Sequence, residues 1–147
     1  MRPKPFTILV LDDDNHDIFF VTRAILNVNP LTHVQAVNNG EEAIRYLNGE
    51  EPYHDRLKFP LPHLILTDLK MPGIDGLEFL HWRQKNHQWA LIPTIMLSGS
   101  GLEKDVRTAY KLGANSYFTK PCDLTKLAGM VRMILEYWTA AHSSRFR

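Results

Sequence analysis

Acidic, hydroxyl and amine side chains follow four short apolar runs of the chain, each at the point where the run ends. A strand that ends in a turn presents such a group at the rim of a sheet, where water, a metal ion and a substrate can reach it. In a parallel sheet all strands point the same way, so the four ends gather at one edge. The residues are Asp12 and Asp13 after the run 8–11, Asp68 after 64–67, Ser98 after 94–97 and Lys120 after 116–119.

Phosphoryl transfer gives each of these groups a role. Packed carboxylates raise one another's pKa, so such a cluster persists when a cation neutralises it. Mg²⁺ fits best, because it prefers hard oxygen ligands and typically uses one or two carboxylates plus phosphate oxygens. The one cysteine and the seven scattered histidines do not argue for Zn²⁺. We expect Asp68 as nucleophile toward phosphorus, Asp13 as direct metal ligand, Asp12 as ligand through water, Ser98 as hydroxyl donor and Lys120 as cation.

The elements that must position these residues alternate between strands and helices. Short apolar runs separated by segments of helical periodicity are typical of βα units with a parallel sheet. The third and fourth strands are apolar almost throughout, as expected for strands covered by helices on both faces. The expected strands are 6–12, 33–37, 63–68, 93–98 and 115–119, and the expected helices are 15–28, 39–48, 75–87, 102–112 and 123–141.

Capping residues and two unusual segments refine this picture. Asp14 or Asn15 can cap the first helix, and Asp123 can cap the last. The stretch 49–62 is expected to be a surface loop inserted before the third strand. In the last helix one stripe should pack on the sheet, while Met130, Met133 and Tyr137 fall off it. The stripe is Leu124, Leu127, Val131, Ile134, Leu135 and Trp138.

The bulk properties favour one soluble domain. A length of 147 residues suits one compact core, which we place at about 6–141 with a disordered tail at 142–147. The net charge of +1 gives no basic field for nucleic acid. A single cysteine, no signal peptide and no run of membrane-spanning length predict a cytoplasmic protein without membrane contact.

Together, these motifs resemble the receiver domain of two-component response regulators over nearly the whole chain. The resemblance implies a flavodoxin-like (βα)5 doubly wound parallel sheet with strand order 2-1-3-4-5. It further implies that Asp68 is the phosphoacceptor, that the main-chain carbonyl of Lys70 joins Asp13 and Asp68 on Mg²⁺, and that the bond from Lys120 to Pro121 is cis. The residues that carry it are Asp12-Asp13, Asp68, Met71-Pro72, Asp75-Gly76, Ser98 and Tyr117-Phe118-Thr119-Lys120-Pro121.

One point inside this resemblance stays open. Three consecutive aspartates leave the metal-ligand register uncertain by one residue, and we favour Asp12 and Asp13 because Leu11 ends the apolar run. The inserted loop and the long last helix make the chain similar to stand-alone receivers of the cyanobacterial phytochrome regulator type.

The resemblance also implies a switch and two partners. Ser98 is expected to move toward the phosphoryl group and Tyr117 to rotate into the vacated space. A histidine kinase or phosphotransfer protein should supply the phosphoryl group, docking beside the first helix near Ile18, Phe19, Phe20 and Val21. The output surface should be the fourth helix, fifth strand and fifth helix. We expect its reader to be another protein or a second copy of this chain forming a homodimer, with Met130, Met133, Tyr137 and Trp138 as candidate contacts.

Two other functions compete with this interpretation. Mg²⁺-dependent phosphohydrolases also form an aspartyl phosphate, but they place a second acid two residues after the nucleophile, where this chain has Lys70. Asp12 does have Asp14 at that spacing. The other alternative is a degenerate receiver that acts only as a docking module, and the complete set of acids, hydroxyl and amine argues against it.

Overall fold

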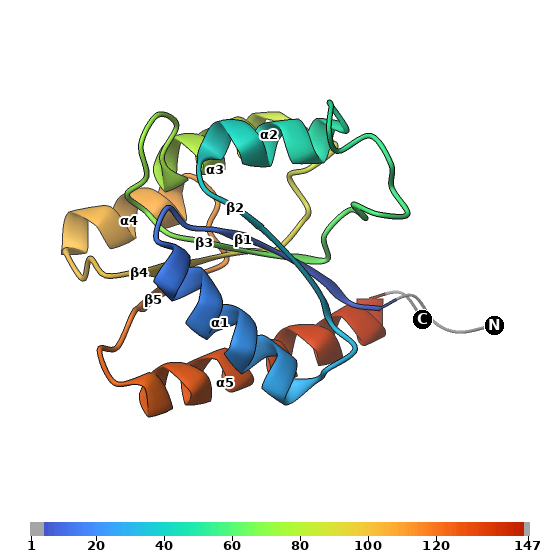
Figure 1. Cartoon of the computed structure of the whole chain (residues 1–147). Helices are drawn as coiled ribbons and strands as arrows, with labels where there is room; N and C mark the ends of the chain where they lie inside the picture. Colours follow the sequence, from blue (N-terminus) through green and yellow to red (C-terminus); the bar gives the residue numbers. More distant parts are fainter. Residues whose placement is uncertain (1–4, 146–147) are drawn as a thin grey trace.

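Five parallel strands form one sheet in the order β2-β1-β3-β4-β5, and helices cover both of its faces (Figure 1). The structure, a computed structural model, describes residues 5–145. The predicted flavodoxin-like fold and its strand order are confirmed. The strands are β1 (Thr7–Leu11), β2 (His33–Val37), β3 (Leu64–Thr67), β4 (Thr94–Ser98) and β5 (Ser116–Thr119). The helices are α1 (Asn15–Val28), α2 (Gly40–Asn48), α3 (Gly76–Lys85), α4 (Glu103–Lys111) and α5 (Leu124–Arg145).

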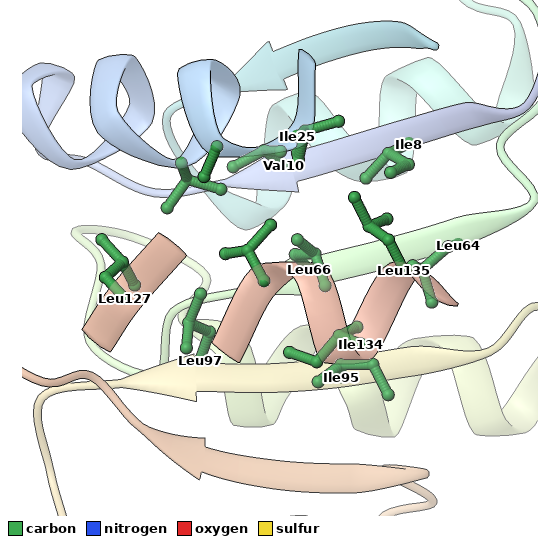
Figure 2. Packing of buried hydrophobic residues seen from close by; sticks show 13 residues of the cluster. Ile8, Val10, Ile25, Leu64, Leu66, Ile95, Leu97, Leu127, Ile134 and Leu135 are labelled. Carbon is green, nitrogen blue, oxygen red and sulfur yellow. The ribbon is translucent and has the colours of Figure 1, made fainter. Parts of the chain in front are cut away.

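Alternate residues of the central strands form the core on one face of the sheet, against α1 and α5. Figure 2 shows Ile8, Leu66 and Ile95 pointing at Ile25 of α1 and Ile134 of α5. Burying aliphatic side chains of this size stabilises the fold by about 1.5–3 kcal/mol each. The sheet and these two helices therefore form one packed core, which supports the sheet edge that carries the polar residues.

The intervening strand residues face α2, α3 and α4. Leu9 and Ile65 pack with Tyr46 of α2 and Phe79 of α3, all fully buried. Toward the β5 side of the sheet, Met96 of β4 continues this layer under α3 and α4. Because both faces are covered, β3 and β4 read as continuous apolar runs in the sequence.

The loop 49–62 lies on the surface, as expected, and Arg56 fastens it to the end of α2. The Arg56 guanidinium donates to the carbonyl oxygens of Tyr46 at 2.8 Å and Leu47 at 2.7 Å. The Tyr46 hydroxyl in turn donates to the carbonyl of Pro60 at 2.7 Å. The loop is thus an ordered cover over the C-terminal end of α2, where Arg56 adds donors to two of the last carbonyls of the helix.

Two expectations about α5 need correction. Leu124, predicted to belong to the buried stripe, is 51 % exposed, because it lines an open depression between α1 and α5 instead of packing into the core. The helix also continues to Arg145 rather than ending at 141, so the predicted tail is helical up to that residue. Residues 146–147 lie outside the described part. Within residues 5–145, none of the helices combines the length and apolar character needed to cross a membrane.

The expected cis bond between Lys120 and Pro121 is wrong. Within residues 5–145 the cis X-Pro bond is the one between Glu51 and Pro52. An X-Pro amide prefers trans by only about 0.5–1 kcal/mol, so the surrounding chain decides the isomer and the dipeptide alone does not.

Candidate functional site

The sheet ladder continues one residue beyond the strand ends and thereby fixes the backbone of three polar residues. The backbone N–H of Asp68 donates to the carbonyl of Leu11 at 2.8 Å, and that of Lys120 donates to the carbonyl of Ser98 at 2.7 Å. The N–H of Asp12 donates to β2 at 3.0 Å. Since Leu11 pairs directly with Thr67, Asp12 and Asp68 follow neighbouring strands at the same level.

Lys120 holds three carboxylates together at this edge. Its Nζ lies 2.6 Å from Asp12 Oδ2, 3.0 Å from Asp17 Oδ2 and 3.2 Å from Asp68 Oδ2. The side chains of Asp12, Lys120 and Asp68 are 5 %, 13 % and 16 % exposed, whereas that of Asp17 is 41 % exposed. Three acids therefore share one ammonium group in a largely dehydrated position.

Burial and the contacts with Lys120 act in opposite directions on the pKa values at this site. Burial raises the pKa of Asp12, and this effect outweighs the hydrogen bond that Lys120 donates to it. Burial alone would lower the pKa of Lys120, but the hydrogen bond to Asp12, the charges of Asp12 and Asp68, and the hydrogen bond to Asp17 raise it overall. Lys120 thus stays protonated, and the acids retain an excess of negative charge.

The donor set fits a divalent cation. One carboxylate oxygen from each of Asp12, Asp17 and Asp68 can be chosen so that all three lie within 4.8 Å of one another. All are hard oxygen donors, and Lys120 neutralises only one of the three charges. A cation placed here would balance the remaining negative charge and favour the ionised form of Asp12, which burial disfavours.

One predicted metal ligand, Asp13, lies outside the group of carboxylates around Lys120. The side chain of Asp13 is exposed and, among residues 5–145, is not part of this group of three carboxylates. Asp17 takes part instead, and sequence reasoning missed it. A signal existed: Asp14 caps α1 and accepts the Asp17 N–H, so Asp17 lies in the first helical turn. Side chains there point back toward the helix N-terminus and the strand edge.

Asp68 is held from both sides of its carboxylate. Its Oδ1 accepts the backbone N–H of Leu69 at 2.7 Å, while Oδ2 faces Lys120. Gly76, the first residue of α3, packs so closely on this turn that a Cβ there would lie 2.0 Å from the Asp68 carbonyl oxygen. Only a residue without a side chain fits this position, so the sequence Asp75-Gly76 fixes the turn that presents Asp68.

The loop that carries Lys70 is tied to the start of α2. The N–H of Ile74 donates to Glu41 Oε1 at 2.8 Å, and the N–H of Gly40 donates to the Ile74 carbonyl at 2.9 Å. Lys70 itself is exposed, beside Asp68 on the same loop. These reciprocal bonds hold the segment between β3 and α3 in place.

Ser98 and Asp68 line the same open depression, which has a volume of about 510 Å³. Lys70 and residues 99–102 complete its wall. Ser98 is 2 % exposed, and its Oγ accepts the N–H of Ser100 at 3.2 Å. Tyr117 is partly buried against the cluster that contains Leu80, Met96 and Ala109, and its hydroxyl donates to the Ser100 carbonyl at 2.7 Å. Ser98 and Tyr117 therefore meet at one loop.

A parallel α/β sheet with an acid cluster, a lysine and a hydroxyl at its carboxyl edge defines a class of protein. The model of the response regulator receiver domain matches residues 8–132 of this chain. The chain therefore belongs to the response regulator receiver family of two-component systems.

Particular relatives narrow this class. The chain is 33 % identical to response regulator Rcp1 of Synechocystis over 91 % of this chain and 89 % of Rcp1. It is 31 % identical to the probable methanogenesis regulatory protein FilR2 of Methanothrix harundinacea over 91 % of this chain and 84 % of FilR2. The similarity to stand-alone cyanobacterial phytochrome response regulators thus agrees with the sequence-based expectation.

Solved structures agree with this result. The phosphorylated cyanobacterial phytochrome response regulator RcpA superimposes with a TM-score of 0.86 at 33 % identity, over 93 % of this chain and 96 % of RcpA. The Mn²⁺-bound form of Rcp1 superimposes with a TM-score of 0.78 at 30 % identity, over 91 % of this chain and 94 % of Rcp1.

Proposed function

We propose that this chain is a single receiver domain that accepts a phosphoryl group on Asp68 and thereby switches a protein-binding surface. The observation that carries the proposal is the contact of Lys120 with both Asp12 and Asp68 beside the depression that Ser98 lines. Receiver domains act as signalling switches, and we place this chain among them rather than among turnover enzymes.

In the proposed transfer, a carboxylate oxygen of Asp68 forms a bond to phosphorus. The bond from phosphorus to the donor breaks, and the electron pair leaves with the donor, either the imidazole of a phosphohistidine or the acetate of acetyl phosphate. Lys120 is already beside Oδ2 of Asp68, so its ammonium can neutralise a phosphoryl oxygen without a large movement. The buried hydroxyl of Ser98 can donate to a second phosphoryl oxygen.

The cofactor in this proposal is Mg²⁺, held by Asp12, Asp13, Asp68 and the main-chain carbonyl of Lys70. When bound, Mg²⁺ supplies positive charge that stabilises the phosphoryl oxygens. The group formed by Asp12, Asp17 and Asp68 supports a divalent cation at this edge, and Mn²⁺-bound Rcp1 is a similar protein with such an ion. Asp17 adds a further acid whose charge favours the cation and whose contact positions Lys120.

A switch follows from the charge that phosphorylation adds. A phosphoryl group on Asp68 brings almost one further negative charge and new acceptor oxygens, which draw Lys120 and Ser98. This biases an equilibrium between two arrangements of Ser98 and Tyr117. In this structure Tyr117 is partly buried and bonded to the loop after β4, which supports its role in the switch.

We propose that a histidine kinase or phosphotransfer protein docks between α1 and α5. A depression of about 280 Å³ lies there, lined by Phe20, Ala24, Leu124 and Leu127, among others. Phe19 and Leu124 add exposed apolar surface, at 54 % and 51 % of their maximum. Val21, by contrast, is buried and belongs to the core, while Ile18 and Phe20 are partly buried. Such apolar patches mark protein contacts.

The output surface is proposed to comprise α4, β5 and α5. Met133 and Tyr137 are 52 % and 64 % exposed on α5, whereas Met130 and Trp138 pack partly against the core. A downstream protein or a second copy of this chain would cover Met133 and Tyr137. We place the protein in the cytoplasm, where its phosphohistidine donor acts.

Mass spectrometry of the intact protein after incubation with Mg²⁺ and acetyl phosphate tests the proposal. We expect an added mass of one phosphoryl group in the wild type and none in Asp68→Asn. An unlabelled wild type would contradict the proposed function. Sustained release of phosphate from an added phosphomonoester would instead favour a phosphohydrolase. Failure of the wild type to bind a divalent ion would favour a degenerate receiver that acts only as a docking module.

A further inference from the structure

Ser100 lies two residues after Ser98, in the loop between β4 and α4, and uses all of its polar groups. Its N–H donates to Ser98 Oγ at 3.2 Å, and its carbonyl accepts the Tyr117 hydroxyl at 2.7 Å. Its own hydroxyl donates to Asp105 Oδ2 at 2.6 Å and accepts the Leu102 N–H at 3.3 Å. Ser100 therefore contacts both switch residues and the first turn of α4.

These hydrogen bonds are compatible with a phosphoryl group on Asp68. A serine hydroxyl has one donor and two acceptor lone pairs, so Ser98 can donate to a phosphoryl oxygen while it still accepts the Ser100 N–H. Ser98 would then link the phosphoryl group to the backbone N–H of Ser100, whose hydroxyl is bonded to Asp105.

The start of α4 depends on this contact. The N-cap residue is Leu102, whose apolar side chain makes no capping bond to the helix within the described chain. The first N–H groups of a helix need acceptors, and an acid in the first turn is stabilised by the helix dipole. Ser100 supplies an acceptor to Leu102, and Asp105 anchors Ser100 from the first turn.

Gly99 gives Ser100 freedom to move relative to Ser98. Its φ is not positive, and a Cβ built on it would meet no atom within 4 Å, so the conformation seen here does not require glycine. Glycine costs conformational entropy when it is fixed. Gly99 allows the backbone next to Ser98 to change conformation, and Ser100 is hydrogen-bonded to α4. The loop is therefore suited to transmit a small displacement of Ser98 to the helix.

We propose that Ser100 and Asp105 are positioning residues that transmit phosphorylation of Asp68 to the start of α4. The Ser100–Asp105 hydrogen bond fastens the loop to the helix, and the Ser98–Ser100 bond connects it to the phosphoryl group. The inference rests on the proposed function. Its consequence is that phosphorylation orders the first turn of α4, which belongs to the proposed output surface.

Hydrogen exchange over residues 99–108, with and without acetyl phosphate and Mg²⁺, tests this inference. In the wild type we expect phosphorylation to slow exchange in this segment. Ser100→Ala and Asp105→Asn should exchange at least about tenfold faster before phosphorylation, because each loses a hydrogen bond to a charged group. Both variants should still be phosphorylated, but their exchange should no longer respond.

Two control variants separate this role from a general effect on the helix. Glu103→Gln removes an acid from the same first turn, where Glu103 pairs with exposed Arg107 at 2.6 Å, and should keep the response. Ser100→Thr keeps the hydroxyl, so its hydrogen exchange should still respond to phosphorylation. A response in Asp105→Asn equal to that in Glu103→Gln would overturn the inference alone. A wild type that gains no phosphoryl mass would overturn both the inference and the proposed function.

Discussion

Lys120 and Asp12 stand 108 positions apart in the sequence, yet Nζ and Oδ2 lie 2.6 Å apart at the carboxyl edge of the sheet. Because Asp17 and Asp68 share the same ammonium, the site carries more negative than positive charge. This excess negative charge attracts a divalent cation and repels a negatively charged phosphoryl donor. Substitution of each of the four residues should therefore change cation binding and phosphoryl transfer to different extents.

Replacing Lys120 by Met should separate cation binding from phosphoryl transfer. Without the ammonium, the repulsion on a divalent cation falls, so we expect the cation to bind about tenfold more tightly. Labelling of Asp68 by acetyl phosphate should slow by at least about 100-fold, because the phosphoryl oxygens lose a neutralising charge. Titration with Mn²⁺ and time-resolved mass spectrometry measure the two effects. Weaker Mn²⁺ binding in the variant would contradict this account of the charges.

The aspartates at this edge should differ in their effect on cation affinity. Asp12→Asn and Asp13→Asn should each weaken Mn²⁺ binding by at least about tenfold if both belong to the ligand set. Asp17→Asn should weaken it less, since this side chain is 41 % exposed. Asp55→Asn, in the distant surface loop, serves as the control. Unchanged affinity in Asp13→Asn together with a large loss in Asp17→Asn would reassign the ligand to Asp17.

Gly76 and Gly129 form a matched pair for testing the turn that presents Asp68. An alanine Cβ at Gly76 would lie 2.0 Å from the Asp68 carbonyl oxygen, whereas one at Gly129 would meet nothing within 4 Å. We expect Gly76→Ala to lower the free energy of unfolding by at least about 2 kcal/mol and to slow labelling. Gly129→Ala should raise that free energy by about 0.5–1 kcal/mol. Urea denaturation measures both, and equal effects would contradict the close packing.

Stability should fall in alkaline solution. Burial raises the pKa of Tyr46, and burial with the hydrogen bond to Glu42 raises that of Tyr53 to about 12. A raised pKa in the folded state contributes stability below the unfolded value of about 10, and that stability is lost as the pH rises through the folded value.

Urea denaturation between about pH 8 and pH 12 follows this loss. Tyr53→Phe should make the decline shallower, whereas Tyr137→Phe, at a position 64 % exposed, should leave it as in the wild type. A decline of the same slope in wild type and Tyr53→Phe would show that Tyr53 does not contribute.

The strand ends and the fold could be predicted because their physical signals are local. Apolar runs such as 64–67, followed by turn-forming polar residues, indicate buried strands without knowledge of the rest of the chain. Parallel order then places Asp12, Asp68 and Lys120 at one edge. Asp14, one of the two residues expected to cap the first helix, is the N-cap of α1 in the structure.

Other features depend on contacts that the sequence does not display. Asp17 lies in the first turn of α1, and its contact with Lys120 depends on how α1 packs against the sheet. Leu124 has the periodicity of the buried stripe, but it is exposed because it lines an open depression between the first turn of α5 and α1. The guanidinium of Arg56 reaches backbone carbonyls, which carry no sequence signature.

The central claim is that the carboxylate of Asp68 receives the phosphoryl group. Borohydride reduction of the labelled protein converts an aspartyl phosphate to homoserine, and tandem mass spectrometry of the peptides locates that residue. The account predicts homoserine at position 68 and unreduced Asp12, Asp13 and Asp17. Homoserine at one of those three positions, or at none after incubation with Mg²⁺ and acetyl phosphate, would contradict it.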